Sequence, residues 1–227
     1  MIQIDNFSFY NADCLEIMKT FSDKQFDLAI VDPPYGIGEH GQRPNRNERW
    51  KNAPKTTKYK KVTWDFEPPT NEYFNELLRV SKNQIVWGAN HFISKLPIDS
   101  SCWIVWDKKT GGDFADCELA WTSFNTAVRK FDWLWNGFRK QEPEDRIHPT
   151  QKPVKLYDFL ITQYAKSDFK ILDTHLGSAS IALAVDKCNV IDNMNLSFTG
   201  IELDSDYFNA AISRFKNNRV PAALPFF

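Results

Sequence analysis

Four consecutive residues, Asp32-Pro33-Pro34-Tyr35, combine a carboxylate, two rigid backbone positions and an aromatic ring. The two prolines fix φ and remove two backbone N–H donors, so the Pro33 carbonyl is held as an acceptor. Asp32 and this carbonyl could each accept one N–H, and Tyr35 could stack on a ring beside them. The arrangement suits a planar group that carries an NH₂. The alternative for these four residues is a rigid turn after a strand.

A second set of polar residues lies in the last third of the chain. Asp173 and Gly177 follow a short apolar run and precede a helical pattern, a strand–turn–helix layout in which a ligand can meet helix N–H groups. Glu202 follows Gly177 by 25 residues, at the end of the next apolar run, where a carboxylate can bind a ribose diol. The loop that begins at Asp173 has no G-x-G-x-x-G pattern, which argues against a pyrophosphate ligand.

The apolar runs and helical patterns predict the elements that position these residues. Apolar runs predict strands at 26–31, 84–87, 103–106, 118–121, 169–172 and 196–203. Helical spacing predicts helices at 70–81, 153–165, 180–187 and 205–218, the first capped by Thr70 and the second beginning at a proline. Strands that alternate with helices indicate an α/β fold with a mainly parallel sheet. Residues 107–150 are turn-rich, so we expect an insertion with little regular helix there.

The tetrapeptide at 32–35 resembles motif IV of the S-adenosylmethionine-dependent amino-methyltransferases of DNA, and other motifs of that family follow in a recognisable order. Four segments carry the rest of the resemblance: Asn11-Ala12-Asp13-Cys14-Leu15, His148-Pro149-Thr150-Gln151-Lys152-Pro153, Asp173-Thr174-His175-Leu176-Gly177-Ser178-Ala179-Ser180 and Gly200-Ile201-Glu202-Leu203-Asp204. The catalytic motif precedes the cofactor motif, which is the circularly permuted order of the family's beta class. The chain departs from the family pattern at His175, where the family has Phe, and at Ala179, where it has a second Gly.

The resemblance implies a Rossmann-like class I methyltransferase fold with a mainly parallel seven-stranded sheet, in a single domain over residues 1–227. It also implies methyl transfer from S-adenosylmethionine to the exocyclic amine of adenine in DNA, with the target base flipped out because the amine cannot be reached inside a duplex. Asp32, Pro33, Pro34 and Tyr35 are then the catalytic residues, and no metal is expected. The residues expected to bind S-adenosylmethionine are Asp13, Cys14, His148, Thr150, Lys152, Asp173, His175, Gly177, Ser178, Glu202 and Leu203.

Three alternatives stay open. The resembled cytosine-amine enzymes more often carry Ser in place of Asp32, so adenine is favoured and the N4 amine of cytosine is the first alternative. An RNA or a protein glutamine is the second, because the same slot holds other planar amines and amides. A binding module that has lost catalysis is the third, and the departures at His175 and Ala179 are its only support.

A basic segment follows the tetrapeptide. Between Arg43 and Lys61 it carries a net charge of +7, against −8 for the rest of the chain, because the whole chain carries −1. We expect the loop 37–61 to contact DNA, and a solvated loop is the alternative. Its basic residues are Arg43, Arg46, Arg49, Lys51, Lys55, Lys58, Lys60 and Lys61. A small insertion at 107–147 is expected to recognise the target, and within it Trp133 and Trp135 are either core or part of a nucleic-acid surface.

The composition excludes several classes of protein. With 227 residues, 42% of them hydrophobic and 25% charged, the chain is neither disordered, collagen-like nor a coiled coil. It has no run of 18 apolar residues free of charge and no signal layout at its N-terminus, so we expect a cytoplasmic protein without a membrane span. The four single cysteines indicate neither a disulfide framework nor a zinc site. A homodimer and a cognate restriction enzyme are partners that the sequence leaves open.

Overall fold

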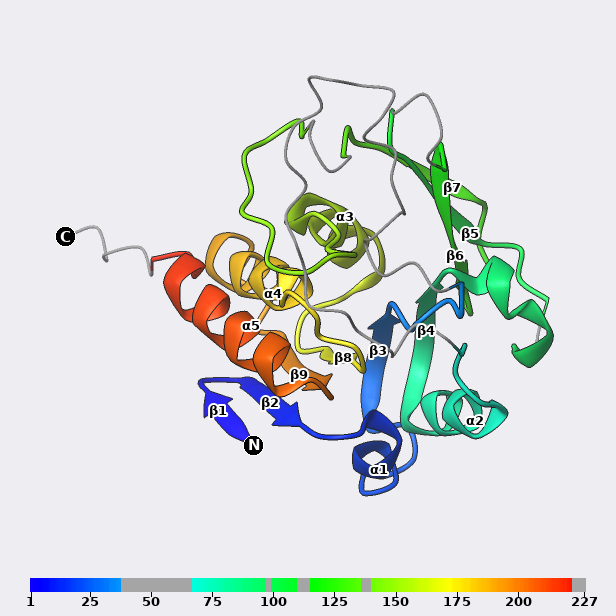
Figure 1. The fold of residues 1–227 in the computed structure, drawn as a ribbon, viewed down its shortest axis with the longest axis horizontal. Coiled ribbons are helices and arrows are strands. Elements are labelled where there is room, and N and C mark those ends of the chain that lie inside the picture. The colour runs from blue at the N-terminus through cyan, green and yellow to red at the C-terminus, as the bar shows by residue number, and fades with distance from the viewer. Residues whose placement is uncertain (38–66, 97–98, 110–114, 136–139, 222–227) are drawn as a thin grey trace, which may run out of the picture.

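The computed structural model describes residues 1–37, 67–96, 99–109, 115–135 and 140–221. In these residues one mixed sheet has nine strands in the order β1-β2-β9-β8-β3-β4-β6-β5-β7 (Figure 1). The strands are β1 (Ile2–Ile4), β2 (Phe7–Asn11), β3 (Phe26–Val31), β4 (Ser81–Trp87), β5 (Trp103–Asp107), β6 (Cys117–Thr122), β7 (Arg129–Asp132), β8 (Lys170–Asp173) and β9 (Ser197–Glu202). The α/β class and the mainly parallel sheet are confirmed.

The expected strand number of seven is wrong for the described residues, and the reason lies mainly at the two edges. β1 pairs antiparallel with β2 through a two-residue turn, and β7 pairs parallel with β5 at the opposite edge. Both edge strands are short, and β7 is mostly exposed. Neither contains the buried apolar run that makes a central strand recognisable in a sequence.

Helices cover both faces of the sheet, as Figure 1 shows. Alternate residues of β3 point to opposite sides, so Leu28 and Ile30 pack in the core beneath α3, α4 and α5, whereas Ala29 and Val31 pack with α1 and α2. Thr70 caps α2 as expected, because its hydroxyl accepts the Tyr73 N–H at 3.3 Å. The helices are α1 (Cys14–Met18), α2 (Asn71–Val80), α3 (Val154–Tyr164), α4 (Ser180–Ile191) and α5 (Ser205–Asn218), with single 3₁₀ turns at Ala89–His91 and Ile93–Lys95.

The strand directions bring acidic side chains to one edge of the sheet. The strands β2, β9, β8, β3 and β4 are parallel neighbours, so their carboxyl ends lie at the same edge. Asp13, Glu202, Asp173 and Asp32 lie at or just after the ends of the first four strands. β6 runs antiparallel to β4, with Trp87 opposite Ala120, so Glu118 near the start of β6 reaches the same edge.

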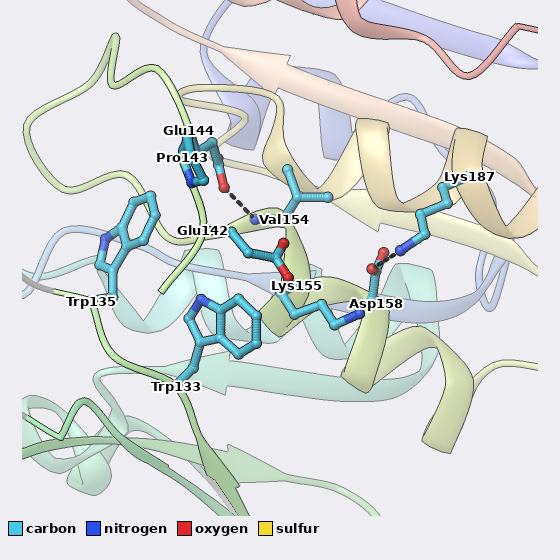
Figure 2. A pocket seen from close by; sticks show the side chains of 9 residues that line it. All are labelled: Trp133, Trp135, Glu142, Pro143, Glu144, Val154, Lys155, Asp158 and Lys187. Carbon is cyan, nitrogen blue, oxygen red and sulfur yellow. Dashed lines mark hydrogen bonds and ion pairs between the residues drawn. The ribbon is translucent and has the colours of Figure 1, made fainter. Parts of the chain in front are cut away.

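The segment expected as an insertion contributes to the sheet and the core. β6 and β7 both lie within 107–147 and continue the main sheet. Trp133 and Trp135 are buried, with exposed fractions of 8% and 5%, so the nucleic-acid alternative for these two rings is wrong. The indole N–H of Trp135 donates to the Gln151 carbonyl at 3.0 Å. Figure 2 shows the two rings beside α3, in the wall of a small hollow that also includes the paired side chains of Asp158 and Lys187.

One arginine joins the segment after α5 to the first turn of the chain. Arg219, just after α5, donates to Asp5 in the β1–β2 turn at 2.7 Å and to Asp186 of α4 at 2.9 Å. This contact closes the sheet edge against the last helix. No helix in the described part of the chain is long and apolar enough to cross a membrane.

Candidate active site

Asp32 lies directly after β3, and both oxygens of its carboxylate have a hydrogen-bond donor. Lys152 Nζ lies 2.5 Å from Asp32 Oδ2, and the Tyr35 hydroxyl donates to Asp32 Oδ1 at 2.8 Å. The Lys152 side chain is only 4% exposed and that of Asp32 18%. Each carboxylate oxygen has two lone pairs, so Asp32 can accept further N–H groups without losing these bonds.

The Lys152 ammonium is shared with a second carboxylate, which belongs to Glu118 of β6. Lys152 Nζ lies 3.0 Å from Glu118 Oε2, and the Tyr35 hydroxyl lies 3.3 Å from the same oxygen. Lys108 forms an ion pair with the other Glu118 oxygen. Charges of alternating sign therefore run from Lys108 through Glu118 and Lys152 to Asp32. We call these four residues the charge chain.

Burial and pairing oppose each other in the charge chain. Burial raises the pKa of Asp32, while the Lys152 charge acts to lower it and limits the rise. Burial also acts to raise the pKa of Glu118, but Lys152 and Lys108 together lower it to about 2. The pKa of Lys152 is raised, because the two carboxylates outweigh the cost of burying its charge. The ammonium and the Glu118 carboxylate are therefore charged at neutral pH.

The Tyr35 ring is held from two directions. It stacks on His91, with ring centroids 5.1 Å apart and planes 16° from parallel. It also fills the space where residue 88 would carry a side chain, because a Cβ built on Gly88 would lie 2.0 Å from Tyr35 Cε1. Gly88 has φ of +68°, so the end of β4 requires glycine on both grounds. The expected stacking of Tyr35 on a target base stays a prediction, and His91 is an aromatic neighbour that sequence reasoning missed.

The second predicted group assembles at the ends of β8 and β9. The Asp173 carboxylate accepts the His175 N–H at 3.0 Å through Oδ1. Glu202 accepts the Gly177 N–H through Oε2 and the Asp204 N–H through Oε1, both at 2.9 Å. Gly177 has φ of +49°, which turns the loop toward α4. The Glu202 carboxylate thus holds the loop between β8 and α4 by its backbone.

This second group carries no balancing cation at ion-pair distance among the described residues. Burial, followed by the charges of Asp32 and Glu202, raises the pKa of Asp173 to about 8. Burial also raises the pKa of Glu202. The two nearby imidazoles are kept neutral by burial, which lowers the pKa of His148 to about 3 and that of His175 to about 4. Donors from a ligand would relieve the cost of these carboxylates.

The other residues predicted to bind a cofactor lie at the start of α1, in the loop before α3, or next to Gly177 and Glu202 in the sequence. Asp13 caps α1, accepting the Leu15 N–H at 2.8 Å, and Cys14 follows it with a pKa raised to about 12 by burial and by Asp13. The Thr150 hydroxyl lies 3.1 Å from His148 Nδ1, and the Ser178 and Ser180 hydroxyls lie 3.0 Å apart. Leu203 is 64% exposed.

An arginine of α5 fixes the segment that carries His148 and Lys152. Arg214 Nη2 lies 2.5 Å from Glu144 Oε1, and the Gln151 side chain donates to the same oxygen at 3.0 Å. The other Arg214 nitrogen, Nη1, donates to the Ser178 carbonyl at 2.6 Å. The loop before α3 and the loop before α4 are therefore held together.

The structure distributes the predicted residues differently from the sequence analysis in one respect. The sequence analysis predicts that Lys152 binds the cofactor, yet its ammonium contacts Asp32 and Glu118. Glu118 and Lys108 were missed, because their contacts depend on β6 running antiparallel to β4. Their one sequence signal is that both lie on a predicted strand or beside one. The whole basic segment from Arg43 to Lys61 lies outside the described residues.

Part of the chain matches the model of a known protein family. Residues 107–213, which contain Glu118, Lys152, Asp173 and Glu202, match the family model described as DNA methylase, for N6 and N4 methyltransferases. The match covers a little under half of the chain, which in this segment is similar to the DNA methylase family.

Individual DNA methyltransferases resemble the chain over most of its length. It is 23% identical to the type II methyltransferase M2.MboI of Moraxella bovis, over 92% of this chain and 88% of that protein. Among solved structures, the M1.HpyAVI–SAM complex has a TM-score of 0.54 at 21% identity, over 92% of this chain and 99% of that one. The PvuII DNA methyltransferase (cytosine-N4-specific) has a TM-score of 0.60 at 13% identity, over 97% and 90%. The fold is therefore that of DNA methyltransferases.

Proposed function

We propose that the chain transfers a methyl group from S-adenosylmethionine to the N6 amine of adenine in DNA. One observation carries the proposal: the Asp32 carboxylate, with its paired ammonium, lies beside the end of the strand that carries Asp173. β3 and β8 are adjacent parallel strands, with Ala29 opposite Leu172, so an acceptor for an amine adjoins a candidate cofactor site. The adjacency is close enough that the Asp32 charge contributes to the raised pKa of Asp173.

The residues at the ends of β8 and β9 fit S-adenosylmethionine by their chemistry. Asp173 Oδ2 receives no hydrogen bond from the described residues, and burial leaves this carboxylate in need of a donor. Glu202 keeps lone pairs on both oxygens after its two backbone bonds, as hydrogen bonding to ribose hydroxyls requires. An uncompensated acidic pair suits a ligand that brings hydroxyl and ammonium donors and a positive sulfonium. With both carboxylates ionised, the pair would repel a pyrophosphate.

When bound, S-adenosylmethionine would supply a methyl group on sulfur, and an N–C bond would form as the S–C bond breaks while the nitrogen loses one proton. Asp32 would accept N–H groups of the target amine, as would the Pro33 carbonyl. These bonds favour a more tetrahedral nitrogen, whose lone pair is otherwise delocalised into the ring. Asp32 is our assignment for the acceptor of the released proton. Orientation and preorganised electrostatics would supply most of the acceleration.

The identity of residue 32 supports adenine over cytosine, since the resembled cytosine-amine enzymes more often carry Ser there. The amine lies inside a DNA duplex, so the base must be flipped out to reach Asp32. The basic residues from Arg43 to Lys61 directly follow the tetrapeptide in sequence, and we propose that they contact phosphates. Each such contact contributes about −0.9 to the slope of log affinity against log salt.

A labelling experiment tests the proposal. The purified chain is incubated with S-adenosylmethionine carrying a tritiated methyl group and with DNA from an unmethylated host, and the nucleosides are separated by chromatography with mass detection. We expect N6-methyldeoxyadenosine from the wild type and about a hundredfold less, or lower still, from Asp32→Asn in the same time. Label in N4-methyldeoxycytidine would contradict adenine specificity and retain the amine chemistry. Label that appears only in added RNA or protein would contradict DNA as substrate.

A further inference from the structure

Glu118 lies outside every motif that the sequence presents, yet it contacts the same two groups that hold Asp32. Its Oε2 is 3.0 Å from Lys152 Nζ and 3.3 Å from the Tyr35 hydroxyl. Asp32 is bonded to the same ammonium and the same hydroxyl. Two carboxylates on two different strands therefore share one pair of donors.

This sharing determines where the two donors point. The Tyr35 hydroxyl has one proton and lies nearer to Asp32, at 2.8 Å, than to Glu118. Lys152 has three N–H donors and can serve both carboxylates together with the Tyr35 oxygen, 3.2 Å away. Without Glu118 the ammonium would lose one of its two anionic partners and be free to move toward Asp32.

The two carboxylates, Asp32 and Glu118, need a second positive charge besides Lys152. One ammonium cannot neutralise two half-buried carboxylates, and an unpaired buried charge is costly. Lys108 supplies the second positive charge, on the Glu118 oxygen that Lys152 does not contact. Glu118 is thereby anchored from its outer side while it holds Lys152 on its inner side.

We propose that Glu118 is a positioning residue for the transfer: it holds Lys152 Nζ and the Tyr35 hydroxyl so that the Asp32 carboxylate keeps one orientation toward the target amine. This inference rests on the proposed function and deepens it. Glu118 itself touches neither the amine nor the cofactor in this scheme. It acts through the two donors.

The charges around Asp32 mean that the inference predicts a change in how the rate of methyl transfer depends on pH. The strongest charge and hydrogen-bond effects on Asp32 come from Lys152, Glu118 and Tyr35. Asp32 also interacts with three titratable groups on the elements around it, Asp173 of β8, Tyr157 of α3 and Tyr73 of α2. Neutralising Glu118 removes a negative charge, so Asp32 should ionise at lower pH. Neutralising Lys108 removes a positive charge and releases Glu118 to pull Lys152, so Asp32 should ionise at higher pH. The two substitutions should therefore move the acid limb of the rate profile in opposite directions.

The test measures methyl transfer by Glu118→Gln and Lys108→Met against pH, with melting temperatures alongside. We expect Glu118→Gln to lower kcat about 10- to 100-fold through misplacement, with KM for DNA and for S-adenosylmethionine little changed. Its acid limb should move to lower pH, and that of Lys108→Met to higher pH with a smaller loss of kcat. Asp27→Asn is the matched control, because the Asp27 side chain is about as little exposed as that of Glu118 and pairs with Lys82, at the start of β3 and away from Asp32. It should keep the wild-type kcat and profile.

Each outcome decides the inference. A Glu118→Gln protein that melts earlier but keeps the wild-type kcat and acid limb would overturn it and leave the proposed function intact. If Glu118→Gln does not fold, Lys108→Met carries the test, and an unshifted limb with unchanged kcat would overturn the inference. A wild-type chain that methylates no DNA would overturn the proposed function and this inference with it.

Discussion

Two pairs of carboxylates lie on one edge of the sheet, and they differ in how the protein balances their charge. Asp32 and Glu118 share a buried ammonium and have a second lysine behind them, so their charges are balanced by the protein. Asp173 and Glu202 are bonded mainly to backbone N–H groups and have no cation at ion-pair distance in the described residues. The effect of the two lysines is clearest at Glu118, whose pKa is lowered to about 2, whereas the pKa of Asp173 is raised to about 8; at Asp32 the Lys152 charge limits the rise that burial causes.

The contrast indicates which kind of ligand each pair of carboxylates can bind. A lysine beside a buried carboxylate opposes the rise in its pKa, and the paired carboxylate can still accept hydrogen bonds from a neutral amine. A carboxylate left without a cation costs free energy until a ligand supplies donors, so part of the binding energy is spent on relieving it. Identical side-chain chemistry thus gives an acceptor in one place and a ligand-dependent anchor in the other.

The first prediction separates the two groups by function. Asp32→Asn should lower kcat for methyl transfer about a hundredfold or more, because a preorganised acceptor is lost, while the affinity for S-adenosylmethionine changes little. Single-turnover kinetics and calorimetry measure the two quantities. Turnover near the wild-type value would end the assignment of Asp32.

The second prediction concerns Glu202, whose replacement should affect cofactor binding. Glu202→Gln should weaken S-adenosylmethionine binding by about 1.5–3 kcal/mol, because a charge-assisted hydrogen bond to the ribose becomes a neutral one or is lost. Calorimetry measures the affinity, and Asp32→Asn serves as the matched control with its affinity retained. Equal affinities in the two variants would place the cofactor elsewhere.

The third prediction concerns the free energy of unfolding of the ligand-free chain. The pKa of Asp173 is about 8 in the folded state against 3.8 ordinarily, so between these values the folded chain holds a proton that the unfolded chain has lost. Stability is then lost as pH rises through this window, by about 1.4 kcal/mol per pH unit. Asp173→Asn removes this loss, so its stability relative to the wild type should grow by that amount from pH 5 to pH 6. Urea titrations at the two pH values check this, and a constant difference would contradict the absence of a compensating cation.

The fourth prediction has the smallest effect and concerns the loop that carries Asp173. Gly177 and Ala179 both have positive φ, at +49° and +59°. Gly177→Ala should cost about 1 kcal/mol of stability through backbone strain, since its Cβ would meet His148 at an ordinary 3.7 Å. Ala179→Gly should change stability by less than about 0.5 kcal/mol, because relief of strain is offset by the loss of a buried methyl and by greater chain entropy in the unfolded state. Thermal melts of the pair test this, and a large gain from Ala179→Gly would show that strain dominates.

The sequence was informative where chemistry depends on neighbours along the chain. β3, α2 with its Thr70 cap, β8 and α4 follow from local patterns, and the tetrapeptide after β3 could be found because four consecutive residues carry it. The partner of Lys152 could not be found in this way, because Asp32, Glu118 and Lys152 come together only through the antiparallel register of β6 and the loop before α3. Trp133 shows a second limit. Alternation along the chain does not reveal whether a side chain faces solvent or the core, and this indole is buried.

The ion pairs of Arg219 have a consequence for how the folded chain opens. Arg219 links the segment after α5 to the turn between β1 and β2 and to Asp186 of α4. Two segments far apart in the sequence therefore depend on one side chain. A local opening that released Arg219 would loosen the β1 edge and the end of α5 together. Asp32 and Asp173 lie at or just after the ends of the central strands β3 and β8, so they would keep their places during such an opening.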